Sequence, residues 1–131
     1  MAKTIRQTRT FNATPRELYD ALMETRKHAA FTGASASISR KVGGRISAYD
    51  DYITGKNIEL VPGRKIVQAW RGSDWPEGLF STAVFELKGV RGGTKLTFTQ
   101  TGVPEQQYEA IKKGWIEFYW TPLTAWLEKG T

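Results

Sequence analysis

A segment near the C-terminus constrains the fold most, because it combines helical spacing with a concentration of large rings. Between residues 115 and 126 it carries five aromatic side chains: Trp115, Phe118, Tyr119, Trp120 and Trp126. With two earlier apolar residues, Tyr108 and Ile111, they recur every three to four positions, which places side chains along one face of a helix. A face this bulky must be covered by another large element. The rings therefore either seal a core or form one wall of a cavity.

The rest of the chain supplies the covering element as a series of strands. Thr14, Pro15 and Glu17 form a capping box that starts a short helix. We predict a first strand at 4–11, a second short helix at 25–30, strands at 36–41, 45–50, 53–61, 65–71, 80–88 and 94–101, and a long helix from about residue 105. This order, β-α-α-β(5-6)-α, predicts an α+β fold in which the long helix covers a mostly antiparallel sheet. Residues 1–131 are expected to form one domain.

Strand alternation predicts polar groups among the side chains that face the long helix. Gln68 shares its parity with Trp70, Gln100 with Phe98, and Arg9 with Phe11. A buried amide or guanidinium without a partner costs a few kcal/mol, so such residues indicate a partner, a water-filled cavity or a ligand. A bulge or a position at a strand end would instead place them in solvent. The candidate pocket residues are Arg9, Phe31, Gln68, Trp70, Phe85, Phe98, Gln100, Trp115 and Tyr119.

Two residues predict an irregular helix at the C-terminus. Pro122 lacks a backbone N–H, so it should kink or interrupt the helix near residues 118–121. Gly114 allows the helix to approach the sheet closely or to bend. A bent helix over a curved sheet can leave a cavity, and it can equally well follow the shape of a solid core.

The net charge of +6 lies entirely in the first third of the chain. Residues 1–45 hold nine Lys and Arg against three acidic residues, whereas residues 46–131 hold ten of each sign. If that third forms one contiguous surface, it attracts an acidic protein, a nucleic acid or an anionic lipid. The alternative is a solvated surface that happens to be basic.

Several kinds of chemistry find no support in the sequence. There are no cysteines, and His28 is the single histidine, so thiolate and His-rich metal sites are excluded and His28 is expected at the surface. Asp50 and Asp51 are adjacent and point to opposite faces of a strand, which makes a poor carboxylate dyad. No catalytic residue, cofactor, metal, nucleic-acid motif or membrane span is predicted. The N-terminus lacks a signal peptide, so a cytoplasmic location is the default.

Several motifs occur together in the order of a known family. They are the stretch from Leu60 to Arg71 with Val61-Pro62-Gly63, the loop Trp75-Pro76-Glu77-Gly78, Gly114-Trp115 with Phe118, Tyr119, Trp120 and Leu123, and the stretches 11–19 and 30–34. Over residues 4–127 the chain resembles the C-terminal domain of activators of the heat-shock protein 90 ATPase. The resemblance implies the helix-grip (START-like) fold, a curved antiparallel sheet around a long C-terminal helix. Full-length eukaryotic activators have a further, separate N-terminal domain, whereas the resemblance in this sequence is to the C-terminal domain alone.

The resemblance and the charge together give two functional hypotheses. The first is a non-catalytic, co-chaperone-like module that contacts an acidic chaperone of the heat-shock protein 90 type. Its candidate contact residues are Arg26, Lys27, Arg40, Lys41, Trp75 and Glu77, with the alternative that Trp75 only plugs its loop. The second is a carrier or sensor that holds a hydrophobic small molecule between the helix and the sheet.

Overall fold

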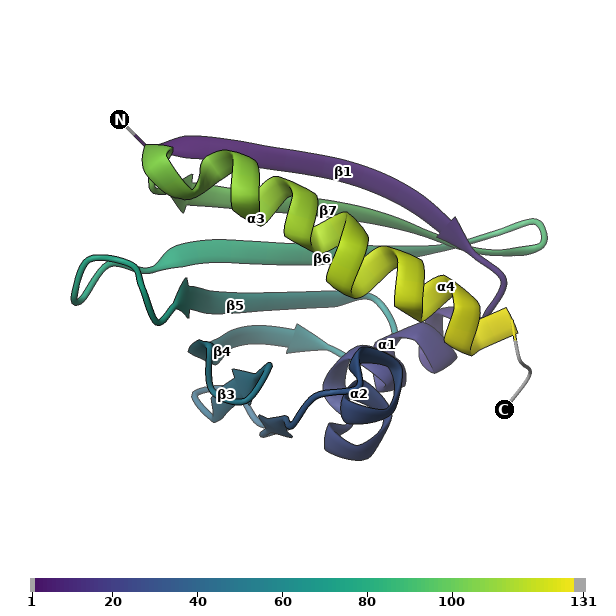
Figure 1. Cartoon of the computed structure of the whole chain (residues 1–131). Coiled ribbons are helices and arrows are strands. Elements are labelled where there is room, and N and C mark those ends of the chain that lie inside the picture. The colour runs from purple at the N-terminus through teal and green to yellow at the C-terminus, as the bar shows by residue number, and fades with distance from the viewer. Residues whose placement is uncertain (1, 129–131) are drawn as a thin grey trace.

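The computed structural model describes residues 2–128 and builds them around one seven-stranded antiparallel sheet (Figure 1). The strand order is β1-β7-β6-β5-β4-β3-β2. The strands are β1 Lys3–Phe11, β2 Ser37–Ile38, β3 Arg45–Ala48, β4 Ile53–Val61, β5 Lys65–Gly72, β6 Ser81–Val90 and β7 Gly93–Val103. The predicted α+β helix-grip class is therefore confirmed.

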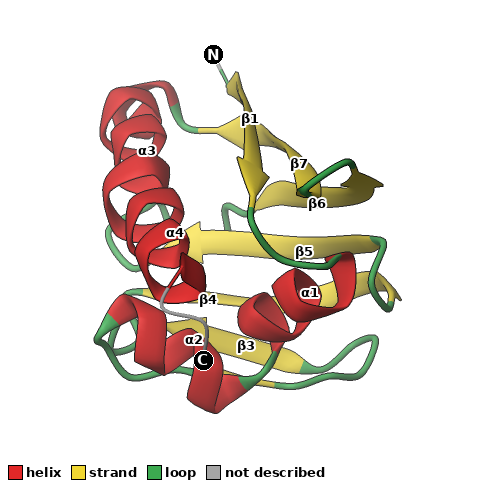
Figure 2. Ribbon diagram, turned by 90° about the vertical axis from the view of Figure 1, so that its right-hand side faces the viewer, coloured by secondary structure: helices red, strands yellow, loops and turns green. Residues whose placement is uncertain are grey.

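Helices gather on one face of this sheet. They are α1 Pro15–Met23, α2 Thr25–Thr32, the 3-10 turn η1 Glu105–Gln107, α3 Tyr108–Gly114, the π-helical segment η2 Trp115–Trp120 and α4 Thr121–Glu128. Figures 1 and 2 show the C-terminal helical segment lying across the strands, with α2 beside its last turns. The capping box forms as predicted: Thr14 Oγ1 accepts from the Glu17 amide at 3.1 Å, and the Thr14 amide donates to Glu17 Oε1 at 2.8 Å.

The second and third strands are shorter than the sequence predicts. The strand expected at 36–41 shrinks to Ser37–Ile38, and the strand expected at 45–50 ends at Ala48. The cause of the second difference is a run of three residues in the left-handed region, Tyr49, Asp50 and Asp51, with φ of 51°, 55° and 71°. Such backbone cannot continue a strand, and nothing in the residue types required three left-handed residues in succession.

The predicted interruption of the long helix takes the form of a π-helical segment. Residues 115–120 follow the wider π pattern, and the Thr121 amide bonds the Ile116 carbonyl five residues back. Because residues five apart share a face in a π turn, Trp115 and Trp120 both point to the sheet and stack, with centroids 5.4 Å apart. Pro122 follows at the start of α4, where its missing N–H leaves the Phe118 carbonyl without an α-helical donor.

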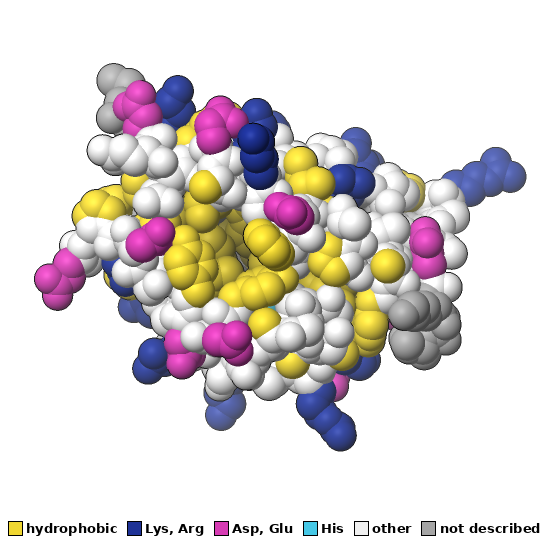
Figure 3. Space-filling view, in the orientation of Figure 1, with side chains coloured by type: hydrophobic (Ala, Val, Ile, Leu, Met, Phe, Trp, Pro, Cys, Tyr) yellow, Lys and Arg dark blue, Asp and Glu magenta, His cyan; other side chains and the backbone are white. Residues whose placement is uncertain are grey.

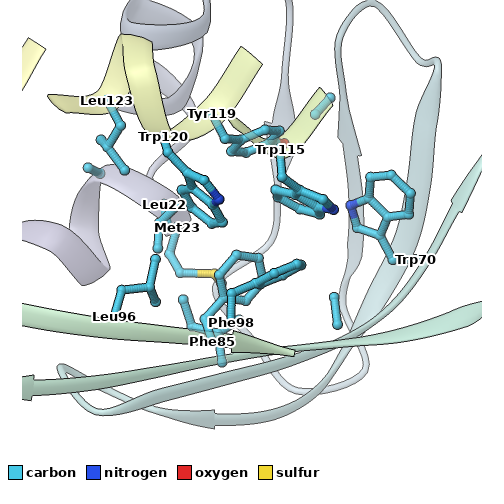
Figure 4. Packing of buried hydrophobic residues seen from close by; sticks show 14 of the residues in the cluster. Leu22, Met23, Trp70, Phe85, Leu96, Phe98, Trp115, Tyr119, Trp120 and Leu123 are labelled. Atoms are coloured by element: carbon cyan, nitrogen blue, oxygen red, sulfur yellow. The ribbon is translucent and has the colours of Figure 1, made fainter. Parts of the chain in front are cut away.

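The core lies between this segment and the central strands. Trp115 and Trp120 point from the helix toward Phe85 of β6 and Phe98 of β7 (Figure 4). Phe98 and Trp115 have the closest ring centroids, 4.3 Å apart. Phe85 and Phe98 are cross-strand partners, so their two rings on the sheet face the two rings of Trp115 and Trp120 on the helix. These four rings form the centre of the core beneath the C-terminal helical segment.

Candidate functional site

The interior beneath the helix is held by a chain of buried hydrogen bonds. The Trp115 Nε1–H donates to Gln100 Oε1 at 2.7 Å, and Gln100 Nε2 donates to Ser81 Oγ at 2.8 Å. Ser81 Oγ in turn donates to the Trp70 carbonyl at 2.7 Å. Gln100 lies inside as predicted, and both polar atoms of its amide group are hydrogen-bonded to protein side chains. A buried amide paired in this way fixes the helix at one height over the sheet.

A second set of hydrogen bonds ties the helix to β1. Trp120 Nε1 donates to Gln7 Oε1 at 2.6 Å, while Gln7 Nε2 donates to the Lys112 carbonyl at 3.0 Å. One glutamine thus joins the edge strand to two turns of the C-terminal helical segment.

Gln68 is also buried and also has protein partners. Its Nε2 donates to Asn57 Oδ1 at 3.1 Å and lies 3.7 Å from the Met23 sulfur. Asn57 Nδ2 then donates to the carbonyls of Ser39 and Lys41 at 2.7 and 2.9 Å. These bonds connect the sheet interior to the β2–β3 turn.

Beside these hydrogen-bonded amides the interior retains a small void, while two buried nitrogens, His28 Nδ1 and Trp75 Nε1, have no hydrogen-bond partner in the described part of the chain. The void measures about 20 Å³, which is room for about one water molecule. The residues that line it are Leu22, Met23, His28, Ile38, Ile46, Ser47, Ala48, Ile53, Ile66, Gln68, Trp70, Phe85, Trp115 and Tyr119. The rings of the aromatic helix therefore seal this side of the molecule.

His28 lies in this interior, and its predicted surface position is wrong. Its side chain is 3% exposed, and Nε2 lies 3.1 Å from the Tyr119 hydroxyl. Desolvation by burial lowers the pKa of His28 to about 4, and burial raises the pKa of Tyr119. No residue near His28 in the sequence indicated this burial, because it follows from how α2 docks against η2.

A second, larger cavity opens on the flank of the same helix. It measures about 370 Å³, and Figure 3 shows a hollow walled by hydrophobic side chains on this face. Its lining comes from the β3–β4 turn, from β4 and β5, and from one side of α3 and η2: Tyr49, Tyr52, Ile53, Trp70, Ala110, Ile111, Gly114, Trp115, Phe118 and Tyr119. Four residues, Ile53, Trp70, Trp115 and Tyr119, line both cavities and separate the small void from the large one.

Two tyrosines at the rim of this cavity have defined hydrogen bonds. The Tyr49 hydroxyl donates to the Phe118 carbonyl, the group that Pro122 leaves without an α-helical donor. The Tyr52 hydroxyl donates to Asp74 Oδ1 at 2.8 Å. Burial raises the pKa of Tyr49 to about 12, and burial followed by the bond to Asp74 raises the pKa of Tyr52 to about 12. Both hydroxyls therefore stay protonated at neutral pH.

The nine candidate pocket residues divide into four groups. Trp70, Trp115 and Tyr119 line both cavities, and Gln68 and Phe85 line only the small void. Phe31, Phe98 and Gln100 are buried but border neither. The prediction for Arg9 needs correction: its side chain is exposed and borders neither cavity, because the helix no longer covers β1 there. Sequence reasoning did not place Tyr49, Tyr52 or Phe118 in the pocket. The signal for the two tyrosines was the Tyr-Asp-Asp-Tyr stretch between two strands, and Phe118 was noted among the rings of the C-terminal helix.

The basic first third of the chain does not form one surface. β1 and β2 lie at opposite edges of the sheet, so Arg6 and Arg9 are separated from Arg40 and Lys41 by five strands. Of the predicted contact residues, Arg40 pairs with Asp20 at 2.8 Å and Lys27 with Glu24 at 3.7 Å, while Arg26, Lys41 and Glu77 are exposed.

Trp75 is buried, which agrees with the alternative that its side chain fills the interior of its own loop. Its side chain is 4% exposed and its ring centroid lies 5.6 Å from that of Trp70. A Cβ at Gly72 would lie only 2.9 Å from Trp75 Nε1 and 2.7 Å from the Tyr52 hydroxyl, so a glycine is needed for the plug to close. The ring itself is therefore not available as a contact in this conformation.

The outer face of the sheet, which no helix covers, carries pairs of like charges instead. Arg45 lies directly opposite Lys56 on β3 and β4, and Lys88 lies directly opposite Lys95 on β6 and β7. All four side chains are exposed, and within residues 2–128 no ion pair joins any of them to an acidic group. Like charges in direct cross-strand register destabilise a sheet, so these pairs oppose folding rather than support it.

Neither a metal cluster nor a membrane span is found in the described part of the chain. Among residues 2–128, no three His, Asp or Glu side chains lie together in a way that could hold a metal ion. No helix in that range is long and apolar enough to cross a bilayer.

Comparison with known proteins identifies one family. A family model described as "Activator of Hsp90 ATPase homolog 1-like protein" matches residues 12–128. The activator of 90 kDa heat shock protein ATPase homolog of Dictyostelium discoideum is 35% identical over 115 residues, 86% of this chain and 30% of that protein. The human homolog 1 is 34% identical over 110 residues, 84% of this chain and 32% of that protein. The chain thus spans about a third of the length of these curated relatives.

Solved structures agree with the fold. The crystal structure of an HSP90 activator from Plasmodium falciparum superposes with a TM-score of 0.91 at 26% identity, covering 95% of this chain and 96% of that one. The solution structure of the Aha1 dimer from Colwellia psychrerythraea gives a TM-score of 0.80 at 20% identity, covering 93% of each chain. The second likeness concerns the fold alone.

Proposed function

Because the chain belongs to the family of activator of Hsp90 ATPase homolog 1-like proteins, we propose that it is a non-catalytic, co-chaperone-like domain that binds a chaperone of the Hsp90 type. The similarity to an HSP90 activator along nearly the whole of both chains supports a binding role for this domain by itself. Since the chain spans only about a third of its curated relatives, binding is proposed here separately from stimulation of an ATPase.

The proposed contact surface rests on two pairs of opposed basic residues on the outer face of the sheet. Arg45 with Lys56, and Lys88 with Lys95, repel each other in the free sheet. Acidic side chains of a partner would remove that repulsion and gain charge-assisted contacts at the same time. An acidic protein fits better than a nucleic acid, because no aromatic side chain lies exposed beside these four residues to stack on bases.

The test measures binding of the purified protein to the Hsp90-type chaperone of its own organism. We expect association at about 50 mM salt that weakens strongly at about 300 mM, because exposed charges are screened. The double variants Arg45→Glu with Lys56→Glu, and Lys88→Glu with Lys95→Glu, should each weaken binding by about tenfold or more.

The matched control reverses two basic residues elsewhere. The variant Arg26→Glu with Lys27→Glu on α2 changes the net charge by the same amount and should leave the affinity within about twofold of wild type. Loss of binding in the α2 variant alone would move the contact to α2 and overturn the outer face as the surface. Absence of any association at low salt would overturn the chaperone proposal itself.

A further inference from the structure

We propose that one corner of the sheet binds an acidic, extended segment of the chaperone that carries a bulky aliphatic side chain. The corner comprises Val42 of the β2–β3 turn and Ile58 of β4, with three basic residues close to them, Lys41, Arg45 and Lys56. We call it the turn–bulge surface. The inference rests on the proposed chaperone binding, and it adds which basic pair makes the central contact and what kind of segment that contact recognises.

Two aliphatic side chains are left in solvent at this corner. Val42 is 64% exposed and Ile58 is 47% exposed. The Gly43 amide donates to the Asn57 carbonyl at 2.8 Å, and the Asn57 amide donates to the Gly44 carbonyl at 2.9 Å. Val42 precedes Gly43 and Ile58 follows Asn57, so these hydrogen bonds bring the two aliphatic residues to the same corner of the sheet.

Ile58 is the extra residue of a β-bulge. The pairing of β4 with β5 shifts between Asn57 and Glu59, and both Ile58 and Glu59 are exposed. In a regular strand two successive residues point to opposite faces, whereas a bulge can re-aim a side chain. The bulge thus keeps an isoleucine and a glutamate together at the surface. Lys65 pairs with that glutamate at 3.5 Å, so Glu59 does not neutralise the basic residues of the turn–bulge surface.

The backbone beneath this surface is held by a buried amide. Asn57 is 1% exposed, and its Nδ2 donates to the carbonyls of Ser39 and Lys41 at 2.7 and 2.9 Å. Its Oδ1 accepts from Gln68 Nε2 at 3.1 Å, which ties the turn to the interior of the sheet. A surface that is already ordered loses less entropy when a partner binds. Val42 therefore projects from a turn that the interior fixes in place.

Basic groups around two aliphatic side chains select an acidic partner. Lys41, Arg45 and Lys56 are exposed, and within residues 2–128 no ion pair joins any of them to an acidic group. Protein interfaces combine an apolar centre with a polar rim. A segment whose carboxylates flank one aliphatic side chain would complement both parts of the turn–bulge surface.

The other basic pair offers less apolar surface. Lys88 and Lys95 lie on the β6–β7 hairpin, where Val90 is 37% exposed. That exposed fraction is smaller than those of Val42 and Ile58, and a single valine cannot match two neighbouring aliphatic residues. We therefore expect Lys88 and Lys95 to contribute charge, and the turn–bulge surface to hold the aliphatic side chain of the partner.

An anionic membrane is the competing partner for a basic and apolar surface. Segments that anchor at a bilayer interface carry Trp, Tyr, Phe or Leu among their basic residues. The exposed phenylalanines of the described chain, Phe80 and Phe118, lie on the β5–β6 loop and on η2 instead. Valine and isoleucine fit a protein segment better.

The first test uses the full chain and synthetic peptides, so it does not depend on the chaperone. A short acidic peptide with one central leucine is compared with the same peptide carrying serine in that place. The leucine peptide should shift the amide signals of residues 41–45 and 56–59 in the nitrogen-15 spectrum, saturably below about 1 mM. The serine peptide should bind at least about fivefold more weakly. Equal binding of the two peptides, or shifts confined to residues 88–95, would overturn the proposal.

The second test removes the apolar centre without changing the charge. Val42→Thr with Ile58→Thr keeps both β-branched shapes, and should weaken binding of the leucine peptide and of the chaperone by about tenfold or more. The loss should be the same at low and high salt, because salt screens charges and not apolar contacts. The matched control, Val90→Thr on the β6–β7 hairpin, should stay within about twofold of wild type. All three side chains are exposed, so the variants should keep the wild-type Tm.

The outcomes separate this inference from the proposed function. Chaperone binding that Val42→Thr with Ile58→Thr leaves unchanged would overturn the turn–bulge surface and leave the chaperone proposal in place. Leucine-dependent peptide binding without any chaperone association would overturn the chaperone as the partner and keep the site. Binding to vesicles rich in phosphatidylserine, abolished by the same double variant, would assign the surface to a membrane and overturn the acidic segment.

Discussion

The same aromatic rings close a packed core on one side of the C-terminal helix and border an open cavity on the other. Toward β6 and β7, Trp115 packs against Phe85 and Phe98, with ring centroids 5.8 and 4.3 Å from its own. Toward the β3–β4 turn, Trp115 and Tyr119 border a cavity of about 370 Å³. The aromatic content of a helix therefore does not determine whether it closes a core or lines a pocket. What determines it is the element on the other side.

The difference between the sides follows from how much sheet each one faces. The sealed side faces the long central strands, ten and eleven residues in β6 and β7. The open side faces the β3–β4 turn with its left-handed residues, the first residue of β4 and Trp70 of β5. A turn offers fewer inward side chains than a pair of long strands to fill the space under rings of this size.

The largest expected effect contrasts two neighbouring aromatic residues of η2. Trp120→Ala removes a fully buried ring and its hydrogen bond to Gln7, and should lower the free energy of unfolding by about 3–5 kcal/mol. Phe118→Ala truncates a half-exposed ring beside the cavity, and should cost less than about 1 kcal/mol. Urea unfolding of both variants measures the difference. Similar losses would remove the distinction between a sealed side and an open side.

A pH-dependent effect of up to about 3 kcal/mol is expected from His28 on the sealed side. Its pKa is about 4 in the folded chain and 6.5 when solvated, so the unfolded state binds more protons between these values. Stability should therefore be complete above pH about 6.5 and should fall as the pH drops toward about 4.

The comparison variant for this prediction is His28→Gln, which keeps a hydrogen-bonding group near Tyr119 but does not titrate. Carboxylates contribute equally to wild type and variant, and His28 is the single histidine, so the difference between the two stability curves isolates this group. Parallel curves from pH 7 to pH 4 would mean that His28 is solvated in the folded protein.

An intermediate effect is expected from the buried relay on the sealed side. Gln100→Leu removes the acceptor of the Trp115 indole N–H and the donor to Ser81 Oγ, which keeps its own bond to the Trp70 carbonyl, and should cost about 1–3 kcal/mol. Thermal unfolding measures the loss, and faster hydrogen exchange of the Trp115 indole proton identifies its source. A variant as stable as wild type with a protected indole proton would show that the relay can be replaced by apolar packing.

The smallest effect is expected on the open side, at the hydrogen bond across the cavity mouth. Tyr49→Phe keeps the ring and removes the donor to the Phe118 carbonyl, and should cost about 0.5–1.5 kcal/mol. Amide exchange in residues 115–121 should quicken, because the π-helical segment loses a tie. Tyr52→Phe, which affects the bond to Asp74 instead, should leave that exchange unchanged. Equal exchange in all three proteins would remove any role of Tyr49 in holding η2.

Local signals in the sequence predicted most of the fold. The capping box at Thr14, the strands β4 to β7 and the inward parity of Trp70 and Phe98 appear in the structure where they were expected. These features depend on residues close in sequence, whose preferences are strong enough to act alone. Strand parity also placed Gln68 and Gln100 inside, although it could not say that Asn57 and Ser81 would satisfy them.

Features that need two distant elements were not predicted. The burial of His28 depends on the docking of α2 against η2, and the exposure of Arg9 depends on where the helix stops covering β1. The basic first third of the chain divided between two edges of the sheet, while basic residues from separate strands met across the outer face. Charge along a sequence and charge on a surface differ because pairing register decides which residues become neighbours.

The sequence by itself determined that a helix crowded with rings would lie over an antiparallel sheet, because periodicity and turn residues act locally. Only the tertiary structure decided that this helix is sealed on one side and open on the other. That outcome depends on a π turn that aligns Trp115 with Trp120, and on three left-handed residues that end β3 early. The two features meet at the hydrogen bond from Tyr49 to the Phe118 carbonyl, between residues 69 apart in the sequence, which no local pattern records.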